Sequence, residues 1–397
     1  MSRPRSTVVR ALAAFAVTVA LAACDTSSTP TTSPLVAGTL VVRAASSGVD
    51  VDSSGYLVAL DNGTPAAIAV NGAVTFQRVV VGQHQVTLGY VGSNCVVGGG
   101  ATQTVTVTSG APDTLTIAVT CVARRLVFES DRDGNTEIYA MNTDGTGLVR
   151  LTNDAGADVL PAWSPDSATI AFSSDRSHPG GLDIWVMHPD GTSPTQLTAA
   201  AGESGAVSWS PDGTRIAFAS TRTDTVPGHA EIWVSGADGS NPVQLTTDDS
   251  LANNPGWSPD GTKLVFQSNR SGTDQIWVMN ADGSGLTNLS NDASNDAYPS
   301  WSPDGTKIVF QSDRDASQAD PTNVEVYVMN ADGSGQTRLT NSPGVDGVPS
   351  WSSDGKVIVF DSDRSGTTEV WRMRPNGTLQ TQITTDASNN GYARFAP

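Results

Sequence analysis

The chain has 397 residues, enough for two or three ordinary domains or one long repeat array. Charged residues make up only 16% of it, and turn-forming Gly, Ser, Thr, Asn and Asp are abundant, which favours many short strands over helices. The formal net charge is −18 at pH 7 and no block of Lys or Arg follows the first ten residues, which argues against a nucleic-acid partner.

The N-terminus has the pattern of an export signal. Three arginines within the first ten residues precede the apolar run ALAAFAVTVA, which is too short for a transmembrane helix. The string LAAC then ends at Cys24 and resembles a bacterial lipobox, whose Cys is lipidated and becomes the mature N-terminus. We expect a lipoprotein signal peptide over 1–23, membrane anchoring through acylated Cys24, and a flexible tether over 24–34. Ordinary secretion is the alternative, and both interpretations place the chain in the cell envelope or outside it.

Residues 35–122 are predicted to form a small β-sandwich. Six runs rich in β-branched and aromatic residues alternate with Gly, Asn, Asp and Pro, a spacing typical of a sandwich. The segment resembles the immunoglobulin-like or PEGA-like modules of bacterial envelope proteins. Cys95 and Cys121 are the cysteines that remain after Cys24, and in an exported chain we expect them to form a disulfide that stabilises the fold by about 3 kcal/mol. A reactive thiol pair is the alternative, but neither Cys has a neighbouring His or Lys.

From residue 124 onward the sequence repeats. WSPDGTKLVFQSNR at 257–270 returns almost unchanged as WSPDGTKIVFQSDR at 301–314. Each repeat carries four strand signatures, typified by xxWSP, KIVFQS, EVYVMN and TRLT, and four short strands per unit of this length indicate a β-propeller blade. The Phe that ends the second strand recurs at intervals of 44 to 50 residues, which defines six units. Its positions are Phe128, Phe172, Phe218, Phe266, Phe310 and Phe360.

Spacing within the repeats indicates how the ring is completed. The first unit lacks a Trp-containing strand, and YARFAP at 392–397 reads like the missing one. We therefore predict an all-β chain whose six-bladed propeller over 124–397 is closed by the C-terminal strand, with the sandwich in front of it. All length variation falls between the Phe and the third-strand aromatic, in even steps that preserve the two faces of the following strand.

Repeats of the form WSPDGTKIVFQSDR…EVYVMNADGSGQTRLT resemble the propeller of TolB, a periplasmic protein of the Tol-Pal envelope system, and the propellers that precede the hydrolase domain of prolyl-oligopeptidase-type peptidases. The resemblance covers about 124–397 and implies the fold much more strongly than the function. Unlike TolB, the chain carries an expected lipid anchor and a sandwich in place of an α/β domain.

Enzymatic activity is not expected. The chain contains no G-x-S-x-G nucleophile elbow and no H-E-x-x-H zinc motif, and it has only four His. Many Asp residues fall in Asp-Gly or Asn-Asp turns. A second-strand Arg follows every Phe, and we expect repeated ion pairs or carbonyl contacts from this series: Arg132, Arg176, Arg222, Arg270, Arg314 and Arg364.

The string DRDGNTE at 131–137 has the alternating oxygens of a calcium loop. Turn chemistry explains it equally well, because the full twelve-residue pattern is missing. No other cofactor is expected. The conceivable calcium ligands are Asp131, Asp133, Asn135 and Glu137.

The second-to-third-strand loops are predicted to form a partner-binding face, because insertions in repeat proteins commonly mark the binding face. We expect a monomeric scaffold for unknown envelope proteins; the alternative is a propeller that binds a glycan or small ligand in its central channel, with or without calcium. Return loops on the same face predict an acidic rim, formed by Asp154, Asp158, Asp248, Asp249, Asp292, Asp296 and Asp386. The candidate contact residues are Ser177, His178, Asp224, Val226, His229, Asp315, Gln318 and Asp320.

Overall fold

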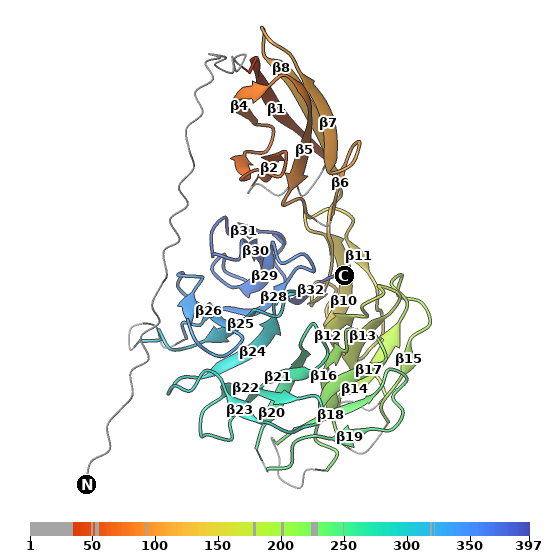
Figure 1. Cartoon of the computed structure of the whole chain (residues 1–397). Helices are drawn as coiled ribbons and strands as arrows, with labels where there is room; N and C mark the ends of the chain where they lie inside the picture. The colour runs from red at the N-terminus through yellow and green to blue at the C-terminus, as the bar shows by residue number, and fades with distance from the viewer. Residues whose placement is uncertain are drawn as a thin grey trace, which may run out of the picture.

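The computed structural model shows an all-β chain in two parts (Figure 1). It describes residues 35–48, 51, 55–92, 94–177, 180–199, 202–223, 229–248, 250–317, 320 and 322–397. The expected signal peptide, Cys24 and tether lie outside these residues. Within the described residues, no helix has the length and apolar character needed to cross a membrane.

Residues 35–122, here called the N-terminal unit, fold as two four-stranded sheets in the orders β4-β1-β8-β6 and β3-β2-β5-β7. A single core joins the two sheets, with Leu40 and Val42 of one facing Val58 and Val86 of the other. Cys95 and Cys121 lie opposite each other in paired strands and form the expected disulfide. The strands are β1 (Ala37–Gly48), β2 (Tyr56–Leu60), β3 (Ala66–Ile68), β4 (Ala73–Val80), β5 (Gly82–Gly89), β6 (Cys95–Val97), β7 (Thr102–Val107) and β8 (Asp113–Cys121).

Residues from 125 onward form six four-stranded antiparallel sheets (Figure 1). Five of these sheets use consecutive strands. The first sheet has the order β11-β10-β9-β32, so the last strand of the chain pairs with β9, with Phe395 opposite Leu126. The innermost strands of the second to sixth and then the first sheet are β12 (Asp158–Trp163), β16 (Ser204–Trp209), β20 (Ala252–Trp257), β24 (Asp296–Trp301), β28 (Asp346–Trp351) and β32 (Asn390–Phe395).

The remaining strands run outward from these in every sheet. Second strands are β9 (Arg125–Ser130), β13 (Ile170–Ser174), β17 (Arg215–Ser220), β21 (Lys263–Ser268), β25 (Lys307–Ser312) and β29 (Ile358–Ser362). Third strands are β10 (Glu137–Asn142), β14 (Asp183–Met187), β18 (Glu231–Gly236), β22 (Gln275–Asn280), β26 (Glu325–Asn330) and β30 (Glu369–Met373). Fourth strands have two residues each: β11 (Val149–Arg150), β15 (Thr195–Gln196), β19 (Val243–Gln244), β23 (Thr287–Asn288), β27 (Thr337–Arg338) and β31 (Thr381–Gln382).

The repeated apolar residues pack between neighbouring sheets, as the sequence predicts. Phe310, which is fully buried, lies against Val265 and Ile276 of the preceding sheet. Equivalent clusters fill each of the other junctions, and one of them joins Val359 of the sixth sheet to Phe128 and Phe395 of the first. Burying these side chains stabilises each junction by roughly 25 cal/mol for every Å² of apolar surface removed from water.

The Asp-Gly strings form the expected tight turns between first and second strands. Ser210 Oγ donates to Asp212 Oδ1 over 2.6 Å, and the Thr214 amide donates to the same oxygen. These hydrogen bonds lower the pKa of Asp212 to about 2. Gly213 in this turn has φ 69°, a left-handed conformation that glycine adopts without steric cost.

The turn of the sixth sheet contacts the N-terminal unit and Arg124, which follows that unit. Its sequence is Ser-Asp-Gly-Lys, where three other repeats have Pro-Asp-Gly-Thr. Arg124 Nη2 pairs with Asp354 Oδ2 at 2.5 Å, and both side chains are more than nine-tenths buried. Lys356 Nζ donates to the carbonyl of Tyr90 over 2.6 Å and lies 4.3 Å from the centre of its ring. The N-terminal unit is therefore attached to the face that carries the Pro-Asp-Gly turns.

Candidate functional site in the central channel

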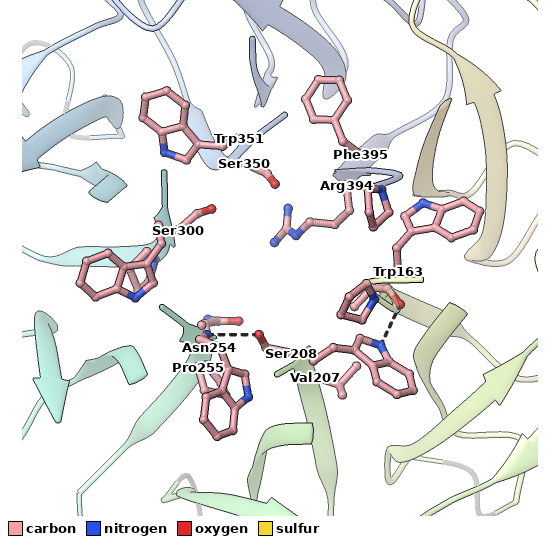
Figure 2. A pocket seen from close by; sticks show the side chains of 18 of the residues that line it. Trp163, Val207, Ser208, Asn254, Pro255, Ser300, Ser350, Trp351, Arg394 and Phe395 are labelled. Atoms are coloured by element: carbon pink, nitrogen blue, oxygen red, sulfur yellow. Dashed lines mark hydrogen bonds between the residues drawn. The ribbon is translucent and has the colours of Figure 1, made fainter. Parts of the chain in front are cut away.

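A cavity of about 480 Å³ lies on the axis and is lined by all six innermost strands (Figure 2). Its volume is within the usual range for small-molecule sites. The lining extends from the middle of each strand to the turns between first and second strands, where Pro165, Pro211, Pro259 and Pro303 surround it. The cavity therefore extends toward the turn face, opposite the second-to-third-strand loops.

Every innermost strand is interrupted by a bulge in the middle, where its pairing with the second strand shifts. The shift places one non-glycine residue of each strand in the left-handed region, with φ between 50° and 57°. Such residues are uncommon, and Val348 is the least expected because it is β-branched. Strained residues of this kind concentrate at functional sites. The six are Leu160, Ala206, Asn254, Tyr298, Val348 and Tyr392.

Side chains of the neighbouring sheet hold four of the bulges in place. Each acceptor is the residue after the buried Phe, and it accepts a hydrogen bond from the bulge amide of the next sheet. The distances are 2.9 Å from Leu160 N to Glu129 Oε2, 3.1 Å from Tyr298 N to Gln267 Oε1, 3.0 Å from Val348 N to Gln311 Oε1, and 3.0 Å from Tyr392 N to Asp361 Oδ2. These contacts satisfy backbone donors that the bulges remove from the ladder.

Two of these acceptors are carboxyl groups in a poorly solvated setting. Burial raises the pKa of Glu129 to about 7 and that of Asp361 to about 8. The Oδ1 atom of Asp361 is buried and has no hydrogen-bond partner among the described residues, which also disfavours the charged form. Tyr392 donates its hydroxyl hydrogen to the hydroxyl of Tyr298 over 2.9 Å, which links two bulge residues, and burial raises the pKa of Tyr392.

The residue before each innermost aromatic also lines the cavity. Five of these residues are small: Ala162, Ser208, Gly256, Ser300 and Ser350. The sixth is Arg394, whose guanidinium group extends into the middle of the cavity in Figure 2. Sequence reasoning missed this residue, although the alignment of YARFAP with the WSP strands shows an Arg where the other repeats have a small side chain.

The arginines at the ends of the second strands are structural, as the sequence predicts. Each donates from Nε to the Ser Oγ two residues before it, over 2.7 to 3.0 Å. Its guanidinium carbon lies 4.5 to 5.2 Å from the ring centre of the third-strand aromatic, within cation–π range.

The described aspartates of the predicted acidic rim all pair with second-strand arginines. Arg314 pairs with both Asp292 and Asp296, at 2.7 and 3.0 Å. Asp154 and Asp158 pair with Arg176, Asp248 with Arg270, and Asp386 with Arg132. Four arginines, which lie 18 or more residues away in sequence, thus face six carboxylates and neutralise them only in part. Asp249 lies outside the described residues.

The candidate calcium residues are not brought together around one point. Asp131 accepts two hydrogen bonds from Asn389, Asp133 accepts one from the Tyr139 hydroxyl, and Asn135 donates to Glu137, which pairs with Arg150. Within the described parts of the chain, no three His, Cys, Asp or Glu side chains are grouped as metal ligands would be. Each of the four residues thus has a hydrogen-bond or ion-pair partner within the chain.

Of the loop residues predicted to contact a partner, His178, Asp224, Val226 and Gln318 lie outside the described residues. Ser177, Asp315 and His229 sit near the bases of their loops, and Asp320 lies in the middle of its loop. Ser177 is exposed and donates to Asp183, while Asp315 is exposed, accepts from the Tyr327 hydroxyl and pairs with Arg338 at 3.0 Å. His229 and Asp320 are partly buried.

Six such sheets around an axial cavity define a β-propeller. Comparison with known proteins identifies its family: the TolB beta propeller domain matches residues 101–199, 249–319 and 316–397, more than half of the chain. The chain belongs to this family.

Individual relatives match over short segments. A TolB homolog from Chlorobaculum tepidum is 45% identical over 49 residues, which are 12% of this chain and 11% of the relative. A Tol-Pal system protein TolB from Desulfosudis oleivorans is 40% identical over 52 residues, 13% of this chain and 12% of the relative. The chain thus spans only about a tenth of the length of these curated relatives.

Solved structures share the fold. TolB from Acinetobacter baumannii superposes with a TM-score of 0.59 at 20% identity, over 69% of this chain and 67% of that one. Hydrazine synthase from Kuenenia stuttgartiensis superposes with a TM-score of 0.56 at 15% identity, over 69% of this chain and 46% of that one. At these identities the likeness concerns the fold alone.

Proposed function

We propose that this chain is a non-enzymatic protein-interaction scaffold of the bacterial cell envelope. Its family supports this class, and one relative is named as a protein of the Tol-Pal system. The observation that carries the proposal is that every length difference between repeats falls in the second-to-third-strand loops, on one face of the propeller. Folding of the propeller does not by itself require loops of different length, so we attribute the variation to binding.

The bases of the longest loops are held by the return loops beside them. Ala230 bridges Leu251, and Val324 bridges Val345, so both connections share one face and support each other. Variable tips on such bases suit recognition of a protein surface, because the base loses little conformational entropy on binding.

The proposal includes a closed six-bladed ring, anchored through Cys24 and the 24–34 tether. The contacts that support closure are the pairing of β32 with β9 and the apolar cluster shared by the first and sixth sheets. Closure would remove the open edge of β9, which would otherwise be an aggregation hazard.

The test uses the chain's own short loops as templates. The fourth and sixth repeats connect these strands with Arg-Ser-Gly-Thr at 270–273 and 364–367, and the longer loops of the second, third and fifth repeats can be cut to this length in even steps. We expect cross-linking in envelope extract to capture a partner with the wild-type chain and not with the shortened variant. A control variant, Thr262→Ala in a turn on the opposite face, should retain capture. Equal capture by all three proteins would contradict the proposal.

A second candidate function is ligand binding in the channel, with a small molecule or glycan as ligand. The cavity favours it, because six repeats line the cavity with side chains that differ from one repeat to the next. A shift in melting temperature with a ligand tests this function without reference to the loops.

A further inference from the structure

Arg394 differs from the six repeated arginines in what it contacts. Its only hydrogen bond within the described structure runs from Nη1 to the carbonyl of Ala393, over 3.0 Å, and no carboxylate there lies within ion-pair distance. Arg314, by comparison, uses its donors on Ser312, Gln336 and two carboxylates. A guanidinium has five donors, so most of those on Arg394 remain available inside the cavity.

The surroundings of Arg394 leave room for a ligand beside it. The five equivalent positions carry side chains no larger than Ser, so the guanidinium is the one long side chain at this level of the channel. Ser208, Ser300 and Ser350 add hydroxyl groups to the same level. Burial strengthens electrostatic attraction to a bound anion, because the local dielectric constant is below that of water.

We propose that the channel binds a small carboxylate-bearing ligand whose carboxylate pairs with the guanidinium of Arg394. The inference rests on the second candidate function above and names its ligand class. Arg recognises carboxylates through two parallel N–H···O bonds, which a planar anion satisfies better than a neutral group. The ligand enters from the turn face, toward which the cavity extends, and the serine hydroxyls contact its remaining polar groups.

The groups that face Arg394 give this binding a pH dependence. Glu129 on β9 and Asp361 on β29 are close enough for their charges to affect Arg394, and Tyr298 and Tyr392 complete the surroundings. Because burial raises the pKa of the two acids to about 7 and about 8, both are neutral at pH 6 and both are ionised at pH 9. The ionised acids repel an anion and compete for Arg394, so affinity for the carboxylate should fall as the pH rises.

The test measures succinate binding to the full chain by calorimetry at constant ionic strength. Arg394→Ser installs the residue that three other repeats carry at this position, so the variant should fold. We expect wild type to bind succinate, the uncharged succinamide to bind at least about tenfold more weakly, and Arg394→Ser to lose at least about tenfold in affinity. Arg125→Gln removes an exposed arginine of β9 and should bind like wild type.

A trialanine peptide with a free or amidated C-terminus distinguishes the two sources of a carboxylate. Tighter binding of the free peptide than of succinate would assign the site to the C-terminal carboxylate of a polypeptide. Tighter binding of succinate would assign it to a small carboxylic acid. Both results support a carboxylate as the ligand group. Equal succinate binding by wild type and Arg394→Ser, or no binding by wild type at about 10 mM, overturns the proposal. Should Arg394→Ser fail to fold, wild-type affinity that does not fall between pH 6 and pH 9 overturns it instead. The loop-dependent capture of a partner is unaffected by either result, so the two functions fail separately.

Discussion

Each repeat contributes side chains both to a junction between sheets and to the channel on the axis. The two regions differ in how strictly the residue types at equivalent positions are repeated. In the junctions the same residue types recur, and all six second-strand Phe side chains are at most 1% exposed. At the bulges beside the channel the equivalent positions hold Leu, Ala, Asn, Tyr, Val and Tyr. The channel lining itself includes one Arg among small residues at a second set of equivalent positions. Packing at the junctions constrains side-chain shape, while the open channel does not, so the channel is where repeats can acquire function.

The largest difference between the regions is expected from truncating an apolar side chain. Phe310→Ala should lower the free energy of unfolding by about 3–5 kcal/mol, because it leaves a cavity in a junction where the side chain is fully buried. Leu160→Ala, in the channel lining, should cost about 1 kcal/mol or less, because that side chain is already partly exposed. Urea unfolding measures both, and equal losses would contradict the distinction.

The two kinds of arginine should differ nearly as much. Arg314→Ala leaves Asp296 fully buried without its ion pair and should cost about 2–4 kcal/mol, less than a fully buried pair would because Arg314 is 19% exposed. Arg394→Ser removes no ion pair to a described residue and should change stability by less than about 1 kcal/mol. Thermal unfolding at neutral pH compares them, and a larger loss for Arg394→Ser would show that its role is structural.

An acid beside the channel and an acid in a turn should respond to pH in opposite directions. Asp361 keeps a proton in the folded state up to its pKa of about 8, while the unfolded chain releases it near pH 4, so this group makes stability fall as the pH rises from 4 to 8. Asp361→Asn should remove that slope and raise stability by about 1–2 kcal/mol at pH 8. Scanning calorimetry at pH 5, 6, 7 and 8 tests this, and a slope unchanged by the substitution would refute it.

Asp212 provides the contrast in a turn. Its pKa of about 2 lies below the value in the unfolded chain, so its stabilising contribution is present above pH 4 and disappears as the pH falls toward 2. Asp212→Asn should therefore leave the profile between pH 5 and pH 8 unchanged.

The smallest effect is expected from the hydroxyl pair in the channel. Tyr392→Phe removes the hydrogen bond to Tyr298 and keeps the edge-to-face ring contact, whose centres are 5.6 Å apart. The loss should be about 0.5–1.5 kcal/mol by chemical denaturation. A second variant, Tyr298→Phe, should match it, because both remove the same bond; clearly different losses would point to separate partners.

Much of the fold follows from spacing alone. Trp-to-Phe distances, the Asp-Gly turns and the four strand signatures predicted the strands of every repeat, and the pattern of the last six residues predicted that β32 would pair with β9. The short β3 and β6 of the N-terminal unit were not predicted, because three-residue strands leave almost no periodic signal. The ion pairs of the acidic-rim aspartates were not predicted, because charge counts do not show which arginine reaches which carboxylate.

The sequence by itself determined the repeat, its four strands and the residues that fill the junctions. Each junction packs in the same way, so the same residue types recur at a constant spacing. Only the tertiary structure decided how distant residues meet. Arg124 pairs with Asp354, 230 positions away, and holds the N-terminal unit against the turn face. Arg394 extends into a cavity shared by all six sheets, with carboxyl groups from two other strands near it. Such contacts depend on where the propeller places each strand.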